Sequence, residues 1–423
     1  MAISKETEKL YTKFLYEELI PAMGCTEPIA LAYGAAYARR LLGKVPTKYT
    51  VECSGNIIKN VMAVTVPQTN GMRGIQAAVL VGALGGDPDL ELEVLSSVTP
   101  QDLEAVKEAA AADIVTIKPL DTTHTLHIII REEAGEDWVS VEIIDSHKNL
   151  GNIYHNGKLI HERGESDTLD NTQERACLNL ADILEYADTV DLEEVREILE
   201  RQLAYNTAIS NEGLTNPWGA RVGQTLLKCR PNDLVTKAKA AAAAGSDARM
   251  NGCTLPVVIN SGSGNQGITV SMPVRVYAEE LGVSHEKLLR ALCVANLTAI
   301  HQKTSVGRLS AFCGALSAAT GAAVGIAYLE DASYEVMAQT ITNSLCDVGG
   351  MVCDGAKSSC AAKIASSVEC ALLGYDLAKQ DLGFRKGEGI VKDNVEDTIA
   401  AVGRMAACGM RETDREILDM MVE

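Results

Sequence analysis

The spacing of hydrophobic residues changes near residue 165, and this change constrains the fold more than any other feature of the chain. From about residue 48 to about residue 162 the spacing is mixed. Residues 124–162 alternate between apolar and polar, with breaks such as AGED and HNGK that favour hairpin turns, and residues 87–112 are expected to supply at least one helix. From about residue 168 onward, almost every segment has helical spacing and strand-like runs disappear. Two further helices are expected at 6–20 and 27–42. The pattern predicts an α+β protein.

A length of 423 residues suits two to three domains. We expect an N-terminal α/β domain at residues 1–165, which carries Cys25, and a large helical domain at residues 166–423. The uncharged segment 309–329 is mostly Ala, Gly and Ser, which is weakly hydrophobic for a bilayer, so it is expected to form a buried core helix and no membrane span. No secretory signal opens the sequence, so the expected location is cytoplasmic.

Charge and aromatic content argue against nucleic acid as a partner. The chain has 38 basic and 57 acidic residues, and its net charge of −19 repels a phosphate backbone. Aromatic residues make up only 4%, so few side chains are available to stack on bases. We therefore expect no nucleic-acid binding.

Twelve cysteines in a chain expected in the cytoplasm favour metal binding or catalysis over disulfides for some of them. The densest group is Cys346, Cys353 and Cys360, each seven residues from the next. On an unbroken helix, seven residues span about 10.5 Å, which is too far for one small metal site. The pair Gly349-Gly350 interrupts such a helix, so a loop could return Cys346 and Cys353 to one site. Cysteines buried on two helix faces are the alternative.

A third thiol could come from Cys313 or from Cys293. Cys313 lies in the small-residue segment, where other backbone can approach closely, and Cys293 lies in an amphipathic helical pattern. By composition alone, the two cysteines are near equals as a third ligand.

A second candidate site is the segment PAMGCTEP, at residues 21–28. Thr26 is a favourable N-cap, and Glu27-Pro28 suit a first helical turn. Cys25 therefore precedes a helix N-terminus, whose partial positive charge favours the thiolate that a base or nucleophile requires. The alternative is an ordinary capped helix whose preceding turn contains a cysteine.

A third candidate site is NSGSGNQG, at residues 260–267, between two apolar runs. The backbone N–H and hydroxyl groups of such a loop form a nest that suits a carboxylate or phosphate. The loop matches neither the P-loop nor the dinucleotide fingerprint, so a small anionic substrate is preferred to a nucleotide, and a plain turn is the alternative. No lysine has a Schiff-base context, so pyridoxal phosphate is not expected as a cofactor.

NSGSGNQG, the run GRLSAFCGALSAATGAAVG and the segment around Cys346 and Cys353 together resemble the α-domain of the iron–sulfur L-serine dehydratases. With GCTEP near the N-terminus, the chain is most similar to the L-cysteine desulfidase branch, over almost its whole length. The resemblance implies an oxygen-sensitive [4Fe-4S] cluster held by three cysteines, with one iron free to act on the substrate. It assigns the ligands to Cys313, Cys346 and Cys353, and it favours Cys313 over Cys293. The last two cysteines lie farther apart in the dehydratases, so the loop between them is shorter here.

The resemblance also implies a reaction, the β-elimination of L-cysteine to pyruvate, ammonia and sulfide. The cluster would act as Lewis acid and Cys25 as the base that removes the α-proton. Thr26, Ser261, Ser263 and Asn265 are expected to contact the substrate. The alternatives are a dehydratase of L-serine or of another β-substituted amino acid, and a binding protein of the same fold without the cluster. The expected partner is a small amino acid, and assembly into a homo-oligomer stays open.

Overall fold

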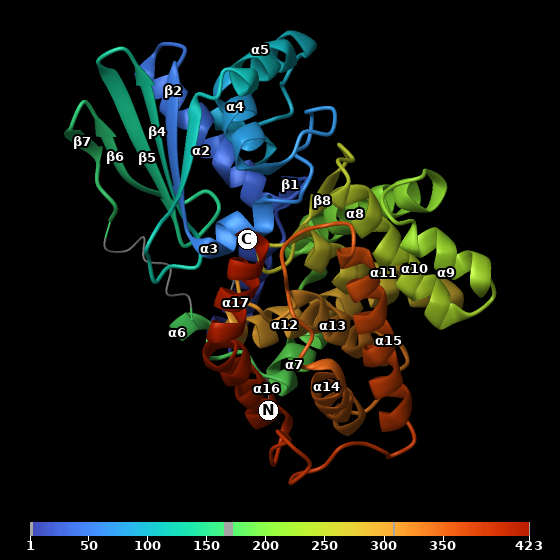
Figure 1. Ribbon diagram of the computed structural model, residues 1–423. Coiled ribbons are helices and arrows are strands. Elements are labelled where there is room, and N and C mark those ends of the chain that lie inside the picture. Colours follow the sequence, from blue (N-terminus) through green and yellow to red (C-terminus); the bar gives the residue numbers. More distant parts are fainter. Residues whose placement is uncertain (1–2, 165–171, 308, 423) are drawn as a thin grey trace.

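A computed structural model of the chain describes residues 3–164, 172–307 and 309–422. A mixed six-stranded sheet lies beside a larger assembly of helices (Figure 1), so the α+β prediction is confirmed. The strand order is β3-β2-β4-β5-β6-β7; β2 and β3 are parallel, and every other neighbouring pair is antiparallel. The strands are β2 (Lys48–Cys53), β3 (Val115–Pro119), β4 (His127–Ala134), β5 (Asp137–Ile144), β6 (Leu150–His155) and β7 (Lys158–His161).

The alternation that predicted β4 and β5 places one apolar row of each strand on a buried face. Ile128 and Ile130 of β4 lie there with Val141 and Ile143 of β5. The helix α2 (Thr26–Leu42) packs across this face, α4 packs on α2, and α5 packs on α4 (Figure 1). Gly34 permits the close contact of α2 with the sheet, because a Cβ there would lie 2.9 Å from the Cδ1 atom of Ile130.

The first part contains further helices besides α2. The helix α3 follows β2 closely in the chain. The helix α1 packs on the helical part of the molecule, where the Tyr11 hydroxyl donates to the Cys177 carbonyl at 3.0 Å. The expected boundary between residues 165 and 166 lies outside the described residues. These helices are α1 (Lys5–Glu18), α3 (Gly55–Val61), α4 (Gly74–Gly85), the 3-10 helix η1 (Pro88–Glu93) and α5 (Pro100–Ala111).

The second part of the chain is helical, as its periodicity predicted, with one exception. Its helices are α6 (Thr172–Arg175), α7 (Leu180–Thr189), η3 (Leu192–Glu194), α8 (Arg196–Thr215), α9 (Val222–Cys229), α10 (Leu234–Met250), α11 (Gly264–Leu281), α12 (His285–Val306), α13 (Gly314–Leu329), α14 (Tyr334–Val348), α15 (Cys360–Ala378), α16 (Val395–Arg404), η4 (Met405–Gly409) and α17 (Arg411–Val422). The exception is the strand β8 (Pro256–Val258), which pairs antiparallel with β1 (Pro21–Met23). Three residues are too few to show alternation, so the expectation that strands disappear was wrong here. Cys25 follows β1 closely in the chain, so this pairing places Cys25 beside the loop that follows β8.

The small-residue segment forms the expected core helix, but the helix starts later than expected. It is α13, which begins at Gly314, so Leu309 to Cys313 precede it and Cys313 is its N-cap residue. A Cβ at Gly321 would lie 2.5 Å from the Ala295 carbonyl oxygen of α12, so only glycine permits this approach. Within the described ranges, no helix combines the length and the apolar character needed to cross a bilayer.

Candidate active site

A cavity of about 110 Å³ lies where the first part of the chain meets the helical part. Its lining comes mainly from the start of α2, the loop between β8 and α11, the segment before α13, and the loop between α14 and α15. Single residues of other elements complete it, among them His147 and Arg249. Of the expected site residues, the cavity brings together the following six: Cys25, Ser261, Ser263, Asn265, Cys313 and Cys353. Two are not in its lining, Thr26 and Cys346.

Cys25 is the N-cap residue of α2, and Thr26, the expected cap, is the first residue of the helix. The Cys25 side chain is buried and donates a hydrogen bond to the Glu27 carboxylate at 3.0 Å. The Thr26 hydroxyl donates to the same carboxylate at 3.1 Å and to the Gly262 carbonyl at 3.0 Å. Thr26 therefore holds the start of α2 against the loop after β8, and this contact occupies its hydroxyl.

The expectation that the helix N-terminus favours a Cys25 thiolate is wrong for this structure. Burial raises the pKa of the Cys25 thiol well above its usual value, and the nearby Glu27 carboxylate raises it further. The Arg249 guanidinium opposes this rise in the pKa. Cys25 is therefore a protonated thiol here, with its proton directed at Glu27.

Cys313 and Cys353 are held side by side by backbone pairing. Phe312 and Val352 form an isolated antiparallel bridge, the Cys313 amide donates to the Met351 carbonyl at 3.0 Å, and the Cys353 amide donates to the Ala311 carbonyl at 2.6 Å. Burial raises the pKa of Cys313 to about 12, and the neighbouring Cys353 thiol adds to the rise.

Cys360 is the third cysteine of this group, at the first turn of α15. Burial raises the pKa of its thiol, and Cys353 again adds to the rise. Gly355 makes the turn between the two residues, with a φ of +92°. Its α-carbon faces the backbone of α3, because a Cβ there would lie 2.3 Å from the Lys59 carbonyl oxygen. The tight turn brings Cys353 and Cys360 to one cavity.

Cys346, which the resemblance assigned as a ligand, lies elsewhere. It is half-buried in the last turn of α14, and burial alone raises the pKa of its thiol. Cys293, the other candidate, is fully buried within α12 and does not line the cavity. The structure thus groups Cys313 and Cys353 with Cys360, and Cys346 is not part of this group.

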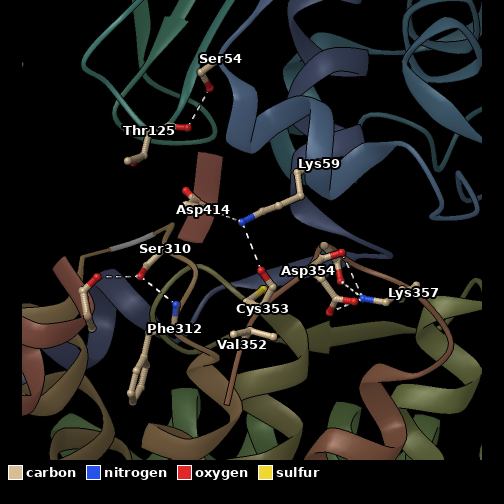
Figure 2. A network of polar contacts seen from close by, with 12 residues as sticks. Ser54, Lys59, Thr125, Ser310, Phe312, Val352, Cys353, Asp354, Lys357 and Asp414 are labelled. Atoms are coloured by element: carbon tan, nitrogen blue, oxygen red, sulfur yellow. Dashed lines mark hydrogen bonds and ion pairs between the residues drawn. The ribbon is translucent and has the colours of Figure 1, made fainter. Parts of the chain in front are cut away.

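Two lysines hold the cysteine loop, and Figure 2 shows the first of them, Lys59, with its partners. Lys59 of α3 forms an ion pair with Asp414 of α17 and donates to the Cys353 carbonyl at 3.3 Å. Lys363 of α15 donates to the Val352 carbonyl at 2.7 Å and pairs with Asp354. Although burial opposes ionisation, Lys357 and Lys363 lower the pKa of Asp354 to about 2. Segments from both ends of the chain therefore fix the position of Cys353.

The loop at residues 260–267 turns back through Ser261 and Gly262, which have φ values of +49° and +78°. Asn260 and Ser263 bridge the turn, and the Ser261 hydroxyl donates to the Asn260 side chain at 2.8 Å. Ser263 is the N-cap residue of α11 and forms no side-chain cap bond. Ser263, Asn265 and Gln266 line the cavity at the N-terminal end of α11, the helix end that favours an anion.

The donor set of the cavity suits an iron–sulfur cluster better than a single metal ion. In the part of the chain that the structure describes, no three His, Cys, Asp or Glu side chains are grouped as ligands of one ion. In a cluster, each thiolate binds a different iron atom, so its ligands stand farther apart than those around one ion. Three thiols around one cavity fit that requirement, and Cys313, Cys353 and Cys360 supply them.

The fold and this cavity define an α+β protein with a thiol-lined site at the junction of its two parts. Residues 89–419 match the family model described as serine dehydratase alpha chain. The chain belongs to this family, so that part of the resemblance is confirmed.

Relatives match over the whole length. The chain is 52% identical over 408 residues to the UPF0597 protein of Lachnoclostridium phytofermentans, covering 96% of this chain and 98% of the relative. It is 48% identical over 416 residues to the UPF0597 protein of Finegoldia magna, covering 98% and 100%. The UPF0597 protein of Treponema denticola is 46% identical over 430 residues, covering both chains completely.

Proposed function

We propose that the protein is a lyase that eliminates sulfide from L-cysteine and yields pyruvate and ammonia. Membership of the serine dehydratase alpha chain family supports a lyase acting on a small β-substituted amino acid. The observation that carries the proposal is the position of Cys25, which faces the same cavity as three further thiols. An iron site held by thiolates is soft, and a soft site suits a leaving thiolate.

Cys313, Cys353 and Cys360 would hold a [4Fe-4S] cluster, which would supply a Lewis acid for the leaving sulfur. The earlier assignment of Cys346 gives way to Cys360 in this proposal, because Cys346 lies outside the cavity lining. Lys59 and Lys363 keep Cys353 in place through backbone carbonyl groups.

Cys25 removes the proton from the α-carbon of the substrate. Its own proton first passes to Glu27 along their 3.0 Å hydrogen bond, which leaves the sulfur free to accept the α-proton. The C–H electron pair forms the new carbon–carbon double bond, and the carbon–sulfur bond breaks with its electrons on sulfur. The aminoacrylate that remains hydrolyses to pyruvate and ammonia. Ser261, Ser263 and Asn265 line the side of the cavity where the rest of the substrate binds.

L-Serine is the second candidate substrate, and the description of the matching family favours it. In that case, Cys25 and Glu27 act in the same way, and water leaves instead of sulfide. The two candidates differ in product, so one assay separates them.

The test is to purify the protein without oxygen, measure iron and acid-labile sulfide, and assay pyruvate and sulfide formation from L-cysteine and from L-serine. About four irons per chain and sulfide release are expected. Cys360→Ser should lose iron and activity, and the matched control Cys346→Ser should retain both. Pyruvate from L-serine alone would replace the desulfidase with a dehydratase. Failure to bind iron after anaerobic reconstitution would leave a binding protein without a cluster.

A further inference from the structure

Arg249 is a buried cation at the cavity that has no carboxylate partner among the described residues. It lies in the last turn of α10 and is only 2% exposed. Its Nη1 donates to the Asn265 side chain at 3.1 Å, and its Nε finds no hydrogen-bond acceptor in the described part of the chain. A buried guanidinium without an anion is unfavourable, so its position calls for a ligand of opposite charge.

The other cations of the cavity differ from Arg249 in this respect. Lys363 is paired with Asp354, and Lys303 donates to the Gly307 carbonyl at 2.6 Å. Lys363 thus has a carboxylate partner, and Lys303 bonds to the C-cap residue of its own helix, α12. Arg249, by contrast, directs its guanidinium at the loop of residues 260–267, where it donates to Asn265.

The loop fits closely around the guanidinium. A Cβ at Gly264 would lie 2.4 Å from the Nε atom of Arg249 and 2.8 Å from its Cζ atom, so the glycine makes room for the group. The same loop is held to the start of α2 by the bond from Thr26 to Gly262. Arg249 is also close enough to Cys25 for its charge to act on that thiol. The guanidinium thus stands near both the loop and the residue that removes the α-proton.

We propose that Arg249 binds the α-carboxylate of the substrate, with Asn265 fixing the guanidinium, so that the α-carbon lies at Cys25. The assignment rests on the proposed function for the identity of the substrate. If the assignment is correct, a ligand needs a carboxylate to bind tightly at the cavity, and its amino group contributes less to the binding affinity. A planar guanidinium can offer two parallel N–H groups to one carboxylate, which a lysine cannot do.

Two analogues of cysteine test this assignment without turnover. 3-Mercaptopropionate keeps the thiol and the carboxylate, and cysteamine keeps the thiol and the amine. Their affinities for the anaerobically purified full chain can be measured by titration calorimetry. In Arg249→Met, we expect 3-mercaptopropionate to bind about 10- to 100-fold more weakly, because a charged hydrogen-bonded pair is lost, and cysteamine to bind as before.

The controls separate binding from folding. Arg249→Lys keeps the charge and should recover part of the lost affinity, and Arg275→Met removes an arginine that pairs with Glu279 outside the cavity lining. An equal loss for both analogues in Arg249→Met and Arg249→Lys would make Arg249 a structural residue and overturn the proposal.

Turnover of L-cysteine tells this assignment apart from the proposed function. If turnover continues with a KM changed no more than in Arg275→Met, the Arg249 assignment fails and the proposed function stands. If no turnover occurs but the analogue affinities still depend on Arg249, the proposed function fails and the carboxylate site stands.

Discussion

Replacing Lys59 by Met should release the C-terminal helix α17 and loosen the cysteine loop. Lys59 is only 1% exposed and pairs with Asp414, which is 19% exposed (Figure 2). Breaking a fully buried pair by removing one partner costs about 3–5 kcal/mol. Because water still reaches Asp414, and because the bond from Lys59 to the Cys353 carbonyl is long at 3.3 Å, we expect a loss of about 2 kcal/mol.

The loss should appear as local opening, because α17 packs mainly on α3, which carries Lys59. Backbone amides of residues 411–422 are then expected to exchange about 30-fold faster, measured by hydrogen exchange and mass spectrometry. Anaerobically reconstituted Lys59→Met should also lose iron faster than the wild type on exposure to a chelator, because the Cys353 loop loses one of the two lysines that hold it.

A matched control is Lys239→Met, which removes another buried lysine, paired with Glu369, far along the chain from α17. It should leave the exchange of α17 unchanged. Combining Lys59→Met with Asp414→Asn should add little to the effect of either substitution, because both remove the same pair. Unchanged exchange of α17 in Lys59→Met would refute this account of the ion pair.

Three further outcomes are expected. Glu132 is buried and its carboxylate has no hydrogen-bond partner among the described residues, so Glu132→Gln should stabilise the fold at pH 7 by about 1–3 kcal/mol. Burial raises the pKa of Glu132 in the folded protein above its value in the unfolded chain. The wild type therefore loses stability as the pH rises above the pKa of the unfolded chain. The variant lacks this carboxyl, so its melting temperatures at pH 5 and pH 8 should differ less than those of the wild type. Gly267→Ala should destabilise by about 1–3 kcal/mol in urea unfolding, because its Cβ would lie 1.9 Å from the Val258 carbonyl oxygen. The matched control for this substitution is Gly350→Ala, which has open space around the added Cβ and should change the free energy of unfolding by less than about 0.5 kcal/mol. Cys25→Ser should abolish turnover and retain iron.

The sequence was a good guide to elements with a strong local period. Alternation predicted β4 and β5, and helical spacing predicted most of the second part. Local patterns do not encode the pairing of β1 with β8, which joins residues more than two hundred positions apart in the chain and places Cys25 beside the loop at 260–267. A three-residue strand is specified by its partner rather than by its own sequence.

The cysteines show the same limit at the level of a site. Cys346, Cys353 and Cys360 are equally spaced, so spacing could not decide which two share a cavity. Two structural features separate them. The helix α14 continues to Val348 and so keeps Cys346 on the helix, and the turn at Gly355 brings Cys353 and Cys360 to the same cavity. The sequence did not predict Arg249 as a site residue either, because it lies in the last turn of an alanine-rich helix whose sequence indicates only a buried core helix.

The two cysteines that begin helices at the cavity connect the stability of the fold with its chemistry. Cys25 and Cys313 are the N-cap residues of α2 and α13, and neither forms a side-chain cap bond. Ser, Thr, Asp and Asn at an N-cap typically stabilise a helix by about 1 kcal/mol over residues that cannot cap. Cysteine at both positions is thus a poor choice for the helix and a useful one for a site that needs thiols.

This reasoning predicts opposite effects of one substitution. Cys313→Ser should raise the stability of the cluster-free protein by about 0.5–1 kcal/mol, because serine can cap α13, and should remove iron binding from the same protein. Urea unfolding of the cluster-free form and iron content after reconstitution give the two readouts. Cys346→Ser, within the last turn of α14, should produce neither effect. If Cys313→Ser bound iron like the wild type, Cys313 would not be a cluster ligand. A functional need for a thiol would then not explain why α13 begins without a side-chain cap bond.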